Sequence, residues 1–360
     1  MKILFITAFP PNRRTAGQNY TRNLLTDLSS DYEIDVFYWE YPGHLLEGNE
    51  KVLSYNRITI KPWYKVFANY LIFFPLFSKR FSLSFLKKLK SLSSNYDIIY
   101  FDFSQTFIYS AFLNHPFMVG MAHDVISQKY SRTKLKILLP WIKLTEKFAL
   151  RRLKYIFTFS NKDQFLLQEE YNKSSRVVPF FIEPNICKIN IQSIKIHSYF
   201  VMYGAWNRTE NQESLKWVLD NSVNSNNRIL IIGGNLPLEF EKEISTRHNF
   251  EYLGFIDNPY EIIAQSKGLI APLFNGAGVK VKAIESLALG TPILGTDITF
   301  EGLPSMKSCA LIKLDAKMSL IQGMSKLEQI TINIKEEIQR EFKEKYVQRT
   351  FKEQLKSLII

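Results

Sequence analysis

Short runs of apolar and β-branched residues alternate along the chain with longer segments whose apolar residues recur at helical spacing. This alternation is typical of βαβ units, in which helices connect the parallel strands of one sheet. In the first half, the pattern predicts strands over residues 2–7, 33–38, 98–101, 117–121 and 155–159. It predicts helices over residues 17–28, 64–92, 133–153 and 162–171. Ser160 has the side chain of an N-cap for the last of these helices.

A second series of the same kind begins near residue 199, after a segment that contains two prolines and loses its periodicity. It predicts strands over residues 199–203, 228–232, 251–253, 268–272, 292–295 and 310–313. The helices are expected over residues 209–220, 237–246, 258–266 and 279–289, followed by a charged helical tail. The sequence therefore predicts two Rossmann-like α/β domains, residues 1–180 and 199–335, joined by a linker over residues 181–198. Residues 336–360 are expected to form a C-terminal helix that packs back towards the first domain.

The composition suits a folded protein of two domains, with 360 residues of which 46% are hydrophobic. Cys187 and Cys309 belong to no C-x-x-C pair, and the five histidines lack metal-ligand spacing. We therefore expect no disulfide framework, no metal site and a reducing compartment. The longest apolar stretch, residues 66–77, is too short to span a bilayer and contains Pro75. The apolar N-terminus ends in two prolines, which favours a buried strand over a signal peptide.

The net charge of +12 is unevenly distributed. Residues 51–96 contain nine Lys or Arg and no acidic residue, and residues 125–162 contain ten against the single Glu146. Both stretches are interleaved with aromatic and aliphatic side chains. This pattern favours a peripheral surface for an anionic membrane, with a solvated basic face or a site for a charged acceptor as the alternatives. Nucleic-acid binding would rest on charge alone, because no nucleic-acid-binding module is recognisable.

One loop and the helix after it combine glycines, cations and a carboxylate. After a predicted strand, Gly276 and Gly278 form a loop, and Lys280 and Lys282 open the next helix, with Glu285 one turn further on. Glycine lets backbone amides approach an anion, and a helix N-terminus attracts negative charge. Lysines in a first turn oppose the helix dipole, so a bound diphosphate would explain them. On these residues alone, an ordinary loop before an amphipathic helix with solvated lysines is an equal alternative.

The same segment has the pattern G-x-G-x-K-x-K-x-x-E-x-x-A-x-G-x-P, followed by T-D and E-G-L. It resembles the nucleotide-sugar half of glycosyltransferase family 4, the group 1 glycosyltransferases. The resemblance implies the GT-B fold, in which two Rossmann-like domains with parallel sheets face a central cleft. It also implies that the loop glycines and both lysines hold the donor diphosphate, and that Glu285 binds the nucleotide ribose. Many members have a further glutamate where this chain has Ala277, which leaves the donor sugar open.

Three other segments resemble the family. In V-M-Y-G-A-W-N-R, Gly204 closes a strand and Arg208 would be a second phosphate cation, whereas a packing role is the alternative for Trp206. In the first half, the resemblance places Gly17 near the donor phosphate, and the alternative is a glycine that starts a helix. In M-A-H-D-V, it implies that His123 contacts the transferred sugar and has a catalytic role, whereas a lone histidine is more often structural.

The expected function is a metal-independent, retaining glycosyltransferase of the hexosyltransferase type, without a cofactor. Its partners would be a nucleotide diphosphate sugar as donor, a glycan or lipid-linked acceptor and an anionic membrane surface, with no nucleic acid. The expected setting is bacterial surface polysaccharide or lipopolysaccharide synthesis, in the cytoplasm at the inner face of the membrane. The alternatives are a catalytically silent paralogue that binds a donor or a partner subunit, and a sugar-nucleotide 2-epimerase. We expect Glu146, the single acid in its stretch, to form an ion pair.

Overall fold

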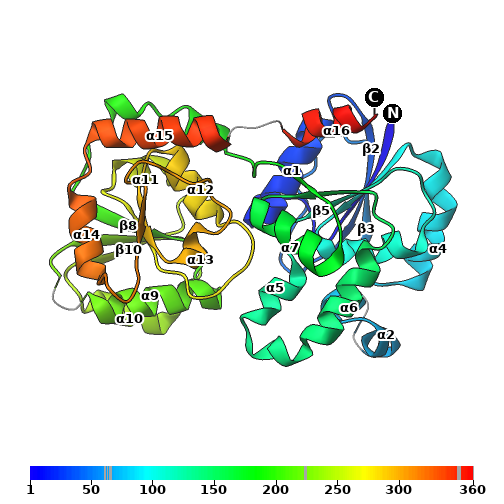
Figure 1. Ribbon diagram of the computed structural model, residues 1–360, viewed down its shortest axis with the longest axis horizontal. Coiled ribbons are helices and arrows are strands. Elements are labelled where there is room, and N and C mark those ends of the chain that lie inside the picture. The colour runs from blue at the N-terminus through cyan, green and yellow to red at the C-terminus, as the bar shows by residue number, and fades with distance from the viewer. Residues whose placement is uncertain (61, 63, 65–66, 223–224, 347–349, 360) are drawn as a thin grey trace. The chain divides into compact units, whose positions relative to one another are not determined.

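The computed structural model (Figure 1) describes residues 1–60, 62, 64, 67–222, 225–346 and 350–359. The chain divides into two compact units: unit 1 consists of Met1–Phe181 and Arg349–Ile360, and unit 2 of Ile182–Gln348. Each unit contains one parallel sheet in its described residues, so the predicted fold class, two parallel-sheet α/β domains, is confirmed. No helix among the described residues is long and apolar enough to cross a membrane.

The sheet of unit 1 has seven strands in the order β3-β2-β1-β4-β5-β6-β7, and every neighbouring pair is parallel. The strands are β1 (Lys2–Thr7), β2 (Glu33–Trp39), β3 (Ser54–Ile58), β4 (Ile98–Asp102), β5 (Met118–Ala122), β6 (Tyr155–Thr158) and β7 (Arg176–Val177). The chain leaves β1 towards β2 on one side and returns to β4 on the other. This reversal makes a topological switch point between β1 and β4, the position where open α/β sheets bind ligands.

The helices of unit 1 are α1 (Ala16–Leu28), α2 (Phe67–Ile72), α3 (Pro75–Ser78), α4 (Leu83–Leu92), α5 (Ile126–Ser131), α6 (Leu139–Leu150) and α7 (Asn161–Tyr171). The long helix expected over residues 64–92 is divided into α2, α3 and α4. Pro75 stands in the first turn of α3, and the Ser82 hydroxyl caps α4 by accepting the amide of Phe85. The Ser160 cap of α7 is confirmed, because its hydroxyl accepts the Asp163 amide at 3.0 Å.

The sheet of unit 2 has six parallel strands in the order β10-β9-β8-β11-β12-β13. The strands are β8 (Tyr199–Tyr203), β9 (Arg228–Ile232), β10 (Phe250–Gly254), β11 (Leu269–Ala271), β12 (Ile293–Gly295) and β13 (Leu311–Lys313). The helices are α8 (Pro184–Cys187), α9 (Thr209–Asn221), α10 (Leu238–Ser245), α11 (Tyr260–Gln265), α12 (Val281–Ala288), α13 (Asp297–Phe300), α14 (Leu320–Glu328) and α15 (Ile332–Tyr346). The switch point of this sheet lies between β8 and β11.

The expected linker and the expected C-terminal helix differ from the structure. The linker region, residues 181–198, contains α8 and a short 3-10 turn, Ile191–Ser193, that packs against α15. Residues 336–360 do not form one helix, because α15 ends at Tyr346 and a separate helix, α16 (Phe351–Ile359), follows. A new helix starts there because Thr350 and Glu353 cap it: the Thr350 amide donates to Glu353 Oε2 at 2.7 Å, and the Glu353 amide donates to Thr350 Oγ1 at 3.3 Å. Of the two helices, α15 belongs to unit 2 and α16 to unit 1.

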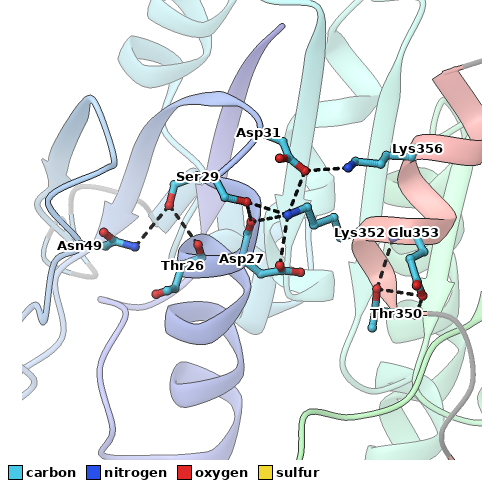
Figure 2. Close-up of polar contacts among 10 residues, drawn as sticks. Thr26, Asp27, Ser29, Asp31, Asn49, Thr350, Lys352, Glu353 and Lys356 are labelled. Atoms are coloured by element: carbon cyan, nitrogen blue, oxygen red, sulfur yellow. Dashed lines mark hydrogen bonds and ion pairs between the residues drawn. The ribbon is translucent and has the colours of Figure 1, made fainter.

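Charged side chains hold α16 against the C-terminal end of α1 (Figure 2). Lys352 Nζ lies 2.8 Å from Asp31 Oδ2 and 3.3 Å from Asp27 Oδ1, and Lys356 Nζ lies 2.7 Å from Asp31 Oδ2. Hydrogen bonding to Lys352, and then to Lys356, lowers the pKa of Asp31 to about 2. The Asp31 contacts are therefore present above the ordinary carboxylate pKa and are lost as the pH falls from about 4 towards 2.

The other side of α16 is apolar and completes the core of unit 1. Phe351 is buried, with ring centroids 5.3 Å from Tyr100 in β4 and 4.8 Å from Phe157 in β6. Leu355, one turn further along α16, is buried as well. Because β4 and β6 are interior strands of the sheet, α16 covers apolar surface that the rest of unit 1 leaves open.

Candidate functional site

The loop between β11 and α12 requires glycine at two positions. Gly276 has φ of +126° and Gly278 has φ of +64°, conformations that L side chains rarely adopt. Lys280 is the N-cap residue of α12, so the helix begins one residue later than its first lysine. In this structure the Lys280 ammonium donates to the loop's own carbonyl oxygens, Gly278 at 2.7 Å and Ala277 at 3.2 Å. The loop is thereby closed over the start of α12.

Lys282 points towards the end of β8, across the switch point. Its ammonium donates to Asn211 Oδ1 at 2.7 Å, and the Asn211 amide in turn donates to the Ala205 carbonyl at 2.8 Å. A Cβ at Gly204 would lie 2.9 Å from Asn211 Nδ2 and 3.1 Å from Lys282 Nζ. Glycine is therefore needed at position 204, because the two side chains fill the space that a Cβ would occupy.

Positive charge gathers at this point. Burial, together with the charges of Arg208 and Lys280 and against an opposing effect from Glu210, lowers the pKa of Lys282 to about 8. Arg208 precedes α9, is half exposed and pairs with Glu210 at 3.7 Å. The structure thus brings together Gly204, Arg208 and both lysines of the motif, where an anion would relieve the repulsion between the three cations.

Glu285 is buried on α12 beneath two phenols that sequence reasoning did not identify. The Tyr260 hydroxyl donates to Glu285 Oε1 at 3.2 Å, and Tyr203 at the end of β8 forms a second hydrogen bond with the carboxyl group. Burial raises the pKa of Glu285 to about 8, and the nearby charge of Glu183 adds to this shift. The carboxyl is thus an acceptor that gains charge only in alkaline solution or when a ligand supplies donors.

A tryptophan and two glycines of this half serve packing. The Trp206 indole is buried and donates to the Ile232 carbonyl at 3.2 Å, which matches the packing alternative. A Cβ at Gly233, whose φ is +130°, would lie 1.8 Å from the Gly204 carbonyl oxygen. Glycine at position 233 therefore allows the backbones after β8 and β9 to lie in contact. A Cβ at Gly290 would lie 2.3 Å from the Lys335 carbonyl oxygen, so this glycine of the motif lets α15 pack closely.

In unit 1, His123 forms a dyad with a carboxylate that the sequence did not single out. His123 Nε2 lies 2.8 Å from Asp102 Oδ1. Asp102 ends β4, is fully buried, and also accepts the hydroxyls of Thr7 at 2.9 Å and Thr21 at 2.5 Å. A carboxylate only accepts hydrogen bonds, so Nε2 carries a proton, which in the neutral form of the imidazole leaves the lone pair on Nδ1. In the sequence, the one feature that could have pointed to Asp102 was its position as a carboxylate at the end of a buried strand beside the switch point.

An aromatic ring fixes the plane of the imidazole. Phe103 stacks on His123 with ring centroids 3.8 Å apart, and its φ of +65° is uncommon for a residue with a side chain. A Cβ at Gly17 would lie 3.0 Å from the Phe103 ring and 3.3 Å from His123 Nδ1. Gly17 is thus placed against His123 at the start of α1, and a side chain there would press on the stacked pair.

Glu146 corrects one expectation. Instead of a cation, its carboxylate accepts the backbone amides of Ile126 at 2.7 Å and Ser127 at 3.0 Å, and the Tyr171 hydroxyl at 2.6 Å. These amides open α5, so Glu146 caps that helix. Burial raises the pKa of its carboxyl, and the three hydrogen bonds oppose the shift. Among the described residues no cation pairs with Glu146, and the N-terminus of α5 supplies positive charge in place of the expected ion pair.

Two parallel α/β units, each with polar side chains at the carboxyl edge of its switch point, define a protein of the GT-B class. Solved structures confirm the fold. The Anabaena protein HepE, solved with UDP, has a TM-score of 0.68 at 12% identity over 96% of both chains. Sucrose-phosphate synthase from Thermosynechococcus elongatus has a TM-score of 0.69 at 15% identity, over 99% of this chain and 98% of that one. WaaG, a glycosyltransferase involved in lipopolysaccharide biosynthesis, has a TM-score of 0.65 at 14% identity, over the same shares.

Sequence comparison finds a family match in one part of the chain. Residues 197–329, which lie in unit 2, match the family described as Glycosyl transferases group 1. The resemblance to the group 1 glycosyltransferases is therefore confirmed, in sequence for this part of the chain and in fold for the whole. No curated protein sequence matches the chain significantly. Among the described residues, no three His, Cys, Asp or Glu side chains are grouped as metal ligands.

Proposed function

We propose that the protein is a retaining glycosyltransferase that uses a nucleotide diphosphate sugar to extend a glycan or lipid-linked acceptor. The observation that carries this proposal is the cluster of Arg208, Lys280 and Lys282 at the switch point of unit 2, with Glu285 one turn away. HepE, which shares the fold, has been solved with UDP and with UDP-glucose. WaaG is involved in lipopolysaccharide biosynthesis, which supports a role in surface polysaccharide or lipopolysaccharide synthesis.

The cations and the loop amides would hold the diphosphate. Negative charge grows on the diphosphate as the glycosidic bond breaks, and fixed positive groups stabilise the transition state most where that charge develops. Three side-chain cations and the amides of a glycine loop supply this stabilisation without a metal ion. Glu285 would accept hydrogen bonds from the two ribose hydroxyls. His123 would contact the transferred sugar, with Gly17 leaving room beside it.

Retention of configuration follows from attack by the acceptor hydroxyl on the face from which the diphosphate leaves. A double displacement would need a carboxylate nucleophile at the sugar, and Asp102, which pairs with His123, is engaged by three hydrogen bonds. The front-face route instead uses the departing diphosphate to accept the proton of the attacking hydroxyl. The charge that builds on the leaving group is then what Lys282 and Arg208 stabilise.

A panel of UDP-, GDP-, ADP-, CMP- and dTDP-sugars tests the donor site by thermal unfolding. A donor at a hundred times its Kd stabilises the folded state by about 2.7 kcal/mol. For a unit of this size, that raises the melting temperature by roughly 5–10 °C. Glu285→Ala removes the hydrogen bonds to the ribose and should reduce the shift by more than half, whereas Glu239→Ala, an exposed control on α10, should keep it. A wild-type protein that responds to no donor would contradict the proposal and favour a silent paralogue, the reading that Ala277 keeps open.

The acceptor is proposed to be met at a membrane, through an apolar and basic face of unit 1. Helix α2 has no buried residue, and Leu71 and Ile72 are 73% and 65% exposed. Ile137 and Leu144, just before and within α6, are 81% and 69% exposed. The Trp141 indole donates to the Ile72 carbonyl at 3.4 Å, so α2 lies beside α6 (Figure 1). Residues 61, 63, 65 and 66 of the basic stretch lie outside the described residues.

Vesicle flotation tests the membrane face. Apolar side chains insert into the headgroup region, and nearby lysines favour anionic lipid. We expect the protein to float with phosphatidylglycerol vesicles and to be released by salt or by vesicles of phosphatidylcholine alone. The double variant Ile137→Glu and Leu144→Glu should reduce flotation about tenfold or more. Leu238→Glu, at a 72% exposed position of unit 2, is the matched control. Flotation that ignores lipid charge, or that survives the double variant, would count against this face.

A further inference from the structure

Unit 1 contains a buried arginine that the proposed donor chemistry does not use. Arg80 follows α3 and is only 5% exposed. Its Nε donates to the Ala8 carbonyl at 3.2 Å, just after β1. No described carboxylate forms an ion pair with Arg80, and burial lowers the pKa of its guanidinium to about 10. A buried cation without a counter-ion is destabilising, so its position requires another explanation.

The two terminal nitrogens of Arg80 have hydrogen-bonding capacity to spare. A guanidinium has five N–H donors, of which the Nε–H alone donates to an atom of the described residues. Neither terminal nitrogen is among the side-chain atoms that are sealed from solvent without a partner. The two terminal nitrogens therefore keep some contact with solvent, and the described residues leave their donors unengaged.

A row of aromatic rings connects Arg80 to His123. The guanidinium lies 4.6 Å from the centroid of the Phe9 ring. Phe9 contacts Tyr41 and Phe103 edge-on, with centroids 5.5 and 5.1 Å apart, and Phe103 stacks on His123. These residues follow β1, β2, β4 and β5, four neighbouring strands, so they lie along one carboxyl edge of the sheet. Tyr41, which contacts Phe9, is 43% exposed.

We propose that Arg80 binds an anionic group, a carboxylate or a phosphate, on the sugar acceptor, with Phe9 and Tyr41 beside the sugar ring. Arginine recognises both groups through paired hydrogen bonds, and aromatic faces pack against the apolar face of a sugar. The switch-point edge already holds His123, which the proposed function assigns to the transferred sugar. The inference rests on that proposed function, and it narrows the acceptor to an acidic or phosphorylated sugar. In the free enzyme the charge of Arg80 is uncompensated, and binding of the anionic acceptor would neutralise it.

Calorimetric titration of the full chain with glucuronate, glucose 1-phosphate and glucose tests the inference. We expect at least one of the two anions to bind the wild type about tenfold or more tightly than glucose. Arg80→Met should lower the affinity for both anionic sugars to that for glucose. Arg80→Lys should retain only part of the preference, because lysine lacks the paired N–H groups of the guanidinium. Glucuronate alone being preferred would indicate a carboxylate acceptor, and glucose 1-phosphate alone a phosphorylated one. An equal response of the wild type to all three sugars would overturn the proposal.

Two controls separate this site from the donor site. Lys282 belongs to unit 2, so Lys282→Met should keep the preference for anionic sugars. A preference that is lost in Lys282→Met but kept in Arg80→Met would overturn the assignment to Arg80. Arg80→Met should still be stabilised by the donor that stabilises the wild type. A wild type that binds an anionic sugar but no nucleotide sugar would contradict the proposed function while leaving the anion site intact. Cooperative thermal unfolding of each variant shows that it folds.

Discussion

If the proposed function holds, Lys282→Met is expected to lower the transfer rate by roughly two to three orders of magnitude without lowering the melting temperature of the free protein. Removing one fixed donor from a developing negative charge has an effect of this size, because the surrounding groups cannot rearrange to replace it. The stability of the free protein should not fall, because burial already disfavours the charged lysine and, within the described residues, its ammonium donates to Asn211 alone. Lys216→Met, at an exposed position on α9, is the matched control and should leave both quantities unchanged. Transfer within tenfold of the wild type would contradict the role.

The pH dependence of donor binding gives a second measure of the same site. The diphosphate binds the protonated Lys282, whose pKa in the free protein is about 8, so its contribution falls as the pH rises through 8. The ribose hydroxyls bind the ionised Glu285, whose pKa is also about 8, so its contribution rises over the same range. The wild-type affinity should therefore pass through a maximum near pH 8. Glu285→Gln should leave only the falling limb and Lys282→Met only the rising one, as titration calorimetry can measure.

Asp102→Asn is expected to impair both the fold of unit 1 and the transfer step. The carboxylate accepts hydrogen bonds from Thr7, Thr21 and His123, and an amide can accept at only one of its two positions. Loss of a buried hydrogen bond to a charged group costs about 2–3 kcal/mol. The melting temperature of unit 1 should fall by roughly 5–10 °C. Transfer should fall by roughly ten- to a hundredfold, because His123 would no longer be held in one orientation.

The tautomer of His123 distinguishes positioning from simple destabilisation. In the wild type the proton is on Nε2, whereas an asparagine amide donating to Nε2 would move it to Nδ1, the nitrogen that faces Gly17. Nitrogen-15 NMR of the imidazole reports this change directly. Thr21→Val removes another donor to the same carboxylate and should lower stability while leaving the tautomer unchanged. A wild-type imidazole protonated on Nδ1, or an unchanged tautomer in Asp102→Asn, would contradict the assignment.

Those parts of the fold and the site that depend on local sequence could be predicted. Strand ends, the Ser160 cap and the loop before α12 are local, because turn chemistry and periodicity act over a few residues. The edge strands β3 and β7 were missed, since β3 is polar and half-exposed and β7 has two residues. The break between α15 and α16 was missed although Thr350 and Glu353 are a capping pair, because the charged tail reads as continuously helical.

The missed site residues depend on contacts between distant parts of the chain. Asp102 meets Thr7 across 95 positions of sequence, and Arg80 meets Ala8 across 72. Tyr260 hydrogen-bonds to Glu285 from α11, and the spacing of apolar residues in the sequence does not show where α11 packs. Single-sequence reasoning places a carboxylate or an arginine at the end of an element, but the partner that gives it a role is set by strand order. Family resemblance did not supply these residues either, since the segments that carry it do not contain Asp102, Arg80 or Tyr260.

In the sequence, α16 is separated from the rest of unit 1 by the whole of unit 2. Unit 1 therefore cannot finish folding until the end of the chain has been synthesised. The ribosome makes residues 182–348 after the seven strands of unit 1 and before the helix that finishes it. At ordinary rates of translation this interval is on the order of ten to thirty seconds. During that time the surface of Tyr100 and Phe157 that Phe351 will cover stays open, and the carboxylates of Asp27 and Asp31 have no lysine partner. Until α16 is made, the nascent first unit thus exposes an apolar and acidic surface. A chaperone, or later α16 itself, can bind there.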